Sequence, residues 1–158
     1  MSGFVSTPAP AVTPPGTMLA CGPFWPDIDL NHFRDSQRIG GTLITDTRVS
    51  SALLGAVISV DTDLETWRAA QEEAGHAQLA AVPGPQIGEE KRLVLLWRRA
   101  VYAHATADLV ETHGDISATG KGQSEAGALD LTADDHRRNA THAIRDILGK
   151  TRTAVELI

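Results

Sequence analysis

The sequence has very little cysteine, since Cys21 is the one such residue among 158. A single cysteine excludes an internal disulfide and a zinc site built from cysteines. No apolar run approaches the ~20 residues that cross a bilayer, so we expect no membrane contact. No Lys or Arg precedes Arg34, so the charged start of a secretory signal is also missing. These absences predict a default location in a reducing cytoplasm.

Aromatic residues and positive charge are also scarce. Three Phe, three Trp and one Tyr leave a core that must rest on Leu, Val, Ile and Ala. A net charge of −6 argues against a protein that coats nucleic acid, because such proteins need a basic face. The hydrophobic fraction of 42% is high enough for a folded chain, and the length suits one domain.

Proline is concentrated at the start, where six of the eight prolines precede residue 27. Proline removes backbone donors and fixes φ, so residues 1–26 are predicted to form an extended arm. The arm ends in two large rings, Phe24 and Trp25. Two interpretations stay open: its last residues fold onto their own domain, or the arm becomes ordered on a neighbouring subunit. The second makes Phe24 and Trp25 candidate interface residues.

Residues 27–149 have the pattern of a helical domain. A short helix is expected within 27–38, capped by Asp27 or Asp29, and longer helices over 46–74, 88–112 and 133–148. The helix over 88–112 is apolar on nearly every side, which predicts a central, buried position. Thr132 and Asp135 have the spacing of a capping box. The predicted core is formed by Leu53, Val57, Val60, Leu64, Leu93, Leu96, Trp97, Val101, Ile144 and Ile147.

The fold class is therefore mainly α: a small helical bundle with an extended N-terminal arm and an extended C-terminal tail. Residues 114–131 are rich in glycine and are predicted to be a loop that is mobile or forms an interface. Lys121 within that loop is a candidate interface residue. The loop is a poor phosphate-binding motif, because five residues separate Gly114 from Gly120 and no Ser or Thr follows Lys121.

Residues 150–158 form the predicted tail, in which β-branched residues alternate as they do in a strand. A lone strand gains little in water, whereas a strand docked on a neighbour gains ladder hydrogen bonds and side-chain pockets. The alternative is a frayed terminus. The candidate interface residues of the tail are Arg152, Thr153, Val155, Leu157 and Ile158.

The adjacent cations Arg98 and Arg99 also have two interpretations. They are either solvated side chains with local ion pairs, or partners for carboxylates of another subunit. Beyond these residues the sequence offers no catalytic set: its six histidines include no pair four apart on one helix, and no Gly-x-Ser-x-Gly elbow occurs. We expect no catalytic residues, metal or cofactor, and a protein that is not an enzyme.

The order of short sequence motifs along the chain resembles that of the GpL-type head completion proteins of Peduovirus-like, contractile-tailed temperate phages. The resemblance covers about residues 24–158 and excludes the proline-rich leader. The motifs that carry the resemblance are Phe24–Leu30, Phe33–Ile39, Ile44–Arg48, Ala69–Gln71, Arg92–Leu96, Arg98–Tyr102, Ala133–Asp135, Ala143–Gly149, Arg152–Thr153 and Val155–Ile158.

This resemblance implies a structural protein of the virion neck, assembled in the host cytoplasm. Such proteins form a homo-oligomeric, often dodecameric, connector ring below the portal, where they close the packaged head and prepare it for tail attachment. The implied partners are the portal protein and a tail completion or terminator protein. Packaged DNA would pass through the lumen without sequence-specific binding. The alternative is a cytoplasmic, non-enzymatic adaptor or regulator that binds a partner through its C-terminal tail.

Overall fold

The computed structural model describes residues 13–39, 44–117 and 131–150, which form a helical bundle. Its helices are α1 (Leu30–Gln37), α2 (Asp46–Glu73), α3 (Arg92–Ser117) and α4 (Ala133–Ile147), with a short 3-10 turn at Leu79–Ala81. Two small antiparallel ladders pair β1 (Met18–Leu19) with β2 (Ile28–Asp29), and β3 (Gln86–Ile87) with β4 (Glu90–Lys91). The predicted mainly helical class is confirmed.

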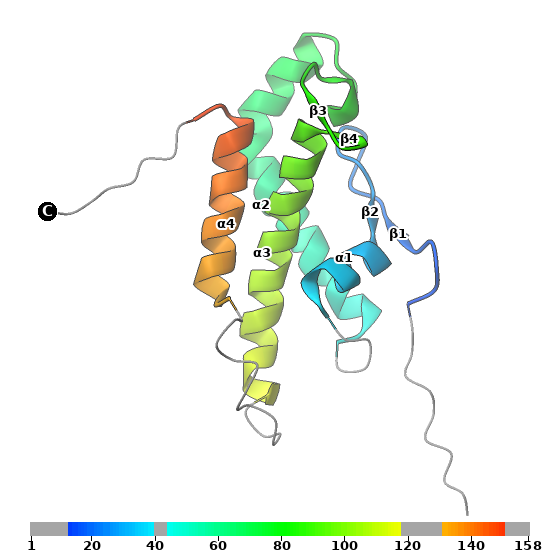
Figure 1. Ribbon diagram of the computed structural model, residues 1–158, viewed down its shortest axis with the longest axis vertical. Coiled ribbons are helices and arrows are strands. Elements are labelled where there is room, and N and C mark those ends of the chain that lie inside the picture. The colour runs from blue at the N-terminus through cyan, green and yellow to red at the C-terminus, as the bar shows by residue number, and fades with distance from the viewer. Residues whose placement is uncertain (1–12, 40–43, 118–130, 151–158) are drawn as a thin grey trace, which may run out of the picture.

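Helix α3 lies at the centre of the bundle (Figure 1). Helix α4 runs along one side of it, α1 lies against the other side, and α2 passes behind and antiparallel to it (Figure 1). Helix α3 is thus covered from three directions, which is the central, buried position predicted from its apolar surface.

The helix ends follow the capping residues. The carboxylate of Asp29 accepts from the backbone N–H of Asn31 at 2.8 Å, and Thr45 caps α2. Thr132 and Asp135 form the predicted capping box of α4, which gives way at Gly149 to a positive φ of 66°. Side-chain acceptors at these positions satisfy backbone donors that have no partner inside the helix.

Helix α3 differs from its predicted bounds at both ends. It begins at Arg92 because residues 86–91 form a tight hairpin, in which Gly88 has a φ of 63°. It continues to Ser117, so the predicted loop boundary at residue 114 is wrong. One glycine inside a helix costs only about 1 kcal/mol, so Gly114 need not end it.

Nine of the ten predicted core residues are buried, and Leu96 is half-buried at the edge of the core. Leu96 follows Leu95 on the start of α3, and both are covered only in part. Trp97, the next residue, is 1% exposed. Successive helical residues differ by about 100° in direction, so neighbours on α3 meet different surroundings.

Phe24 and Trp25 require a correction, because both lie in the core of their own domain, at 2% and 6% exposure. The indole of Trp25 stacks on that of Trp97 with ring centroids 5.6 Å apart, and its Nε1–H donates to Asp61 at 2.8 Å. The Phe24 carbonyl accepts from the backbone N–H of Leu79 at 2.9 Å. Of the two interpretations of the arm, the one in which its last residues fold onto their own domain is correct.

Candidate assembly surfaces

The charged residues singled out from the sequence fall into two groups. The guanidinium of Arg98 pairs with Glu90 at 2.8 Å, so this cation is neutralised within its own chain. Arg99 is exposed, and no ion-pair partner for it lies among the described residues. The local interpretation therefore fits Arg98, whereas Arg99 remains available to a carboxylate of another molecule.

The other predicted site residues lie outside the described part of the chain. They are Lys121, Arg152, Thr153, Val155, Leu157 and Ile158. The described residues do show where α4 ends, just before the tail. The backbone N–H of Lys150 donates to the carbonyl of Arg145 at 2.9 Å, which closes the last turn after Gly149. Helix α4 therefore ends before the tail begins.

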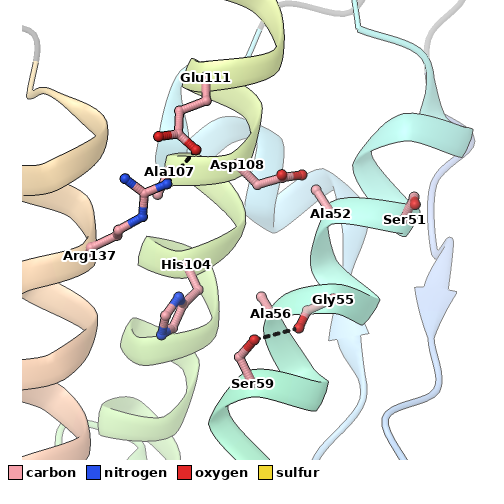
Figure 2. Close-up of a pocket in the computed structure, with 10 residues that line it drawn as sticks. All are labelled: Ser51, Ala52, Gly55, Ala56, Ser59, His104, Ala107, Asp108, Glu111 and Arg137. Atoms are coloured by element: carbon pink, nitrogen blue, oxygen red, sulfur yellow. Dashed lines mark hydrogen bonds and ion pairs between the residues drawn. The ribbon is translucent and has the colours of Figure 1, made fainter.

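A polar groove of about 290 Å³ runs between α2 and the α3–α4 pair (Figure 2). Burial lowers the pKa of His104 in this groove, which favours the neutral imidazole at pH 7. The Ser59 hydroxyl donates to the carbonyl of Gly55 at 3.1 Å, while Arg137 pairs with Glu111 (Figure 2). Ser59, Arg137 and Glu111 are therefore engaged within the chain.

The rest of the described structure contains neither a candidate metal site nor a reactive thiol. No group of three metal-ligating side chains occurs within residues 13–39, 44–117 and 131–150. Burial raises the pKa of the Cys21 thiol to about 11, so it stays protonated and unreactive at neutral pH. None of the helices described is both long enough and apolar enough to span a bilayer.

Two further surfaces leave large apolar side chains exposed. The outer side of α2 exposes Leu54 and Ile58, at 43% and 67%. On the other side of the bundle, a groove of about 440 Å³ lies over α3 between α1 and α4. Its lining includes Arg99, Tyr102 and the exposed Leu131.

Sequence reasoning missed the outer side of α2, although a signal was present. Apolar residues occur there in adjacent pairs, Leu53 with Leu54 and Val57 with Ile58, and no charged residue falls between Val49 and Val60. Adjacent helical residues point about 100° apart, so a single buried stripe cannot cover both members of each pair. The second member of each pair is the exposed one.

Comparison with known proteins gives the family. The profile of "Phage head completion protein (GPL)" matches residues 19–158. The "Head completion/stabilization protein" of Escherichia phage P2 is 33% identical over 135 residues, covering 85% of this chain and 79% of the relative. The "Probable head completion/stabilization protein" of Haemophilus phage HP1 (strain HP1c1) is 28% identical over 144 residues, covering 90% and 93%. No solved structure matches. The chain belongs to the phage head completion protein (GPL) family.

Proposed function

We propose that this protein is a non-enzymatic structural subunit of the phage neck. It forms a ring below the portal, closes the DNA-filled head and prepares it for tail attachment. The observation that carries the proposal is the family match, which extends over residues 19–158 and so includes both the bundle and the tail. The engagement of Ser59, Arg137 and Glu111 within the chain is consistent with a role that needs no catalysis.

The C-terminal tail is the proposed contact with the portal or with an adjacent subunit. The last turn of α4 is closed at Lys150, so residues 151–158 are not needed to complete the helix. Their alternating sequence suits strand addition to a neighbour, with Val155, Leu157 and Ile158 as apolar anchors. Burial of each anchor would contribute roughly 1.5–3 kcal/mol before ordering costs.

Ordering a short tail costs about 1–2 kcal/mol per backbone residue, so one tail alone binds weakly. A ring presents many tails at once, and simultaneous contacts raise the effective affinity without any new interaction. The net charge of −6 also suits a lumen through which DNA slides without sticking. Repeated weak tails and an acidic surface both favour a ring over a monomeric adaptor.

The test is complementation of a phage genome that lacks this gene. The full chain should restore heads that keep their DNA protected from nuclease, and it should sediment with purified portal rings. The variant that ends at Lys150 should keep the helical circular dichroism of the full chain and lose both activities.

Two outcomes would count against the proposal in different ways. A full chain that stays a small monomer with portal rings, and that does not complete heads, removes the connector role. A truncated chain that completes heads normally removes only the role of the tail.

A further inference from the structure

The exposed side of α2 forms a continuous ridge that the fold of one chain leaves uncovered. Its residues recur every three or four positions and therefore share one side of the helix. We call them the α2 ridge: Leu54, Ile58, Thr62 and Glu65, all of which are exposed. Ser51 and Gly55 lie at its edge, where they line the polar groove between α2 and α3. The first part of the ridge is uncharged and carries the two exposed aliphatic side chains, and Glu65 makes its far end acidic.

The opposite side of the bundle carries a surface with complementary features. We call it the α3 groove: Leu95, Arg99 and Ala103 on α3 line it, with Leu131 just before α4. Val110, about two turns beyond Ala103, extends the same side of α3. Leu131 and Val110 are 49% and 39% exposed. Arg99 lies at its basic end, beside Arg98, and is free of an ion pair within the described residues.

The ridge and the groove point in opposite directions. On α3, Trp97 and Val101 are buried at 1% and 0%, whereas Arg99 between them is exposed. A step of two residues on a helix turns the side chain by about 200°, so Arg99 faces away from that buried side. Figure 1 places α2 behind α3, with α1 and α4 flanking the side of α3 that faces the viewer.

The two surfaces also match in height along the bundle. Helices α2 and α3 are antiparallel, and the polar groove between them brings Gly55 and Ser59 to the level of His104 (Figure 2). With a rise of about 1.5 Å per residue, Leu54 then lies near the level of about residues 105–109, within about one and a half turns of Val110, and Glu65 lies within about two turns of Arg99. The apolar parts therefore share one level, and the charged parts share the other.

We propose that the α2 ridge of one copy docks into the α3 groove of the next copy and forms the repeating contact of the ring. The contact refines the ring proposed above and rests on it. Copies related by rotation about an axis parallel to the bundle keep the same height and direction. Leu54 then meets the apolar surface around Val110, Ile58 lies over Ala103, and Glu65 meets Arg99.

A contact between two different faces is heterologous, so it propagates from copy to copy and closes when the rotation allows. A two-fold dimer, by contrast, would place the same face on both sides of the interface. The net charge of −6 makes the copies repel one another in general. The pairing of acidic Glu65 with basic Arg99 therefore selects one orientation.

Mixed cysteine cross-linking tests the geometry of this contact. Leu54→Cys and Val110→Cys are prepared as separate proteins, oxidised alone and then oxidised as a mixture. Both positions are exposed, and the buried Cys21 does not compete for oxidation. The mixture should give a cross-linked dimer, and neither protein alone should. Ile87→Cys, at a side chain 54% exposed on the β3–β4 hairpin, is the matched control and should not cross-link with Leu54→Cys.

Charge reversal tests the orientation. Glu65→Arg and Arg99→Glu should each weaken self-association about tenfold, and the double variant should recover most of that loss because the pair is restored in swapped form. Efficient cross-linking of Leu54→Cys with itself, no cross-link in the mixture, or no recovery in the double variant would overturn the inference. If such a result accompanies normal head completion by the unmodified chain, the proposed function stands and this contact alone is wrong.

Discussion

Residues 13–29 and the α3–α4 pair are both attached to the same core, but by different kinds of interaction. The N-terminal segment is held by a few specific contacts: the Thr13 hydroxyl donates to Asp46 at 2.6 Å, and Trp25 is fixed by stacking and by Asp61. The α3–α4 pair instead buries small residues on both helices, such as Ala107 on α3 and Ala140 on α4.

The difference shows two ways in which segments of a small chain pack against a shared core. Alanine faces let two helices approach closely, and the interaction is spread over many similar contacts. An irregular segment has no such repetition, so each of its anchors carries a larger share of the stability. Substitutions should therefore have their largest effect at the anchors of residues 13–29.

The largest effect is expected for Trp25→Ala. The side chain is 6% exposed and stacked on Trp97, so truncation should lower the free energy of unfolding by about 3–5 kcal/mol. Chemical denaturation followed by circular dichroism measures the loss. Trp25→Phe is the matched control, because it keeps one aromatic ring while it loses the donor to Asp61 and the second ring of the indole; it should cost less. A loss below ~1 kcal/mol for Trp25→Ala would show that the segment is not anchored there.

Truncations in the helical pair should cost less and depend on burial. Ile144→Ala on α4 should lower the free energy of unfolding by about 3 kcal/mol, because this side chain is 6% exposed. Leu96→Ala should cost only about 1 kcal/mol, because Leu96 is half-buried at the edge of the core. The same denaturation experiment compares them, and equal losses would contradict the difference in packing.

Acid should weaken the contact that joins the N-terminal segment to α2. The hydrogen bond from Thr13 and then the guanidinium of Arg34 lower the pKa of Asp46 below its ordinary 3.8. A carboxylate with a lowered pKa stabilises the fold above its unfolded pKa, and this stability is lost as the pH falls through the folded value.

Asp46→Asn should therefore cost about 1–2 kcal/mol at pH 7, a figure reduced because Asp46 is partly exposed to solvent. The difference from the unsubstituted chain should shrink as the pH falls below about 4. Thermal unfolding between pH 7 and pH 2 gives both values. A difference that stays constant with pH would show that the carboxylate charge has no part in the contact.

The same physics decides which features of the two regions the sequence can predict. The stripe Leu53, Val57, Val60 and Leu64 has helical spacing, so the sequence predicts α2 and its buried side. The capping chemistry of Thr132 predicts where α4 begins. Periodicity and caps are local signals, and a single sequence contains them in full.

Contacts between distant residues have no such signal. Trp25 meets Trp97 and Asp61 across long stretches of chain, and nothing in its neighbours specifies those partners. For this reason the burial of Phe24 and Trp25 stayed one of two alternatives. The exposure of Leu54 and Ile58 was missed for a different reason. Hydrophobicity alone does not distinguish a side chain in the core from an apolar side chain on the surface.

A similarly small effect is expected at the cap of α4, which sharpens the comparison because it is a local contact in the periodic region. Thr132 accepts from the backbone N–H of Asp135 at 3.2 Å, and Asp135 accepts in return from the N–H of Thr132 at 3.1 Å. Thr132→Ala should lower the free energy of unfolding by about 1 kcal/mol, because one backbone donor at the helix start loses its acceptor. Thr132→Ser keeps the hydroxyl and should stay close to the original stability in the same denaturation experiment. If the alanine and serine variants unfold at the same denaturant concentration, the capping box does not stabilise α4, and packing against α3 alone sets where the helix begins.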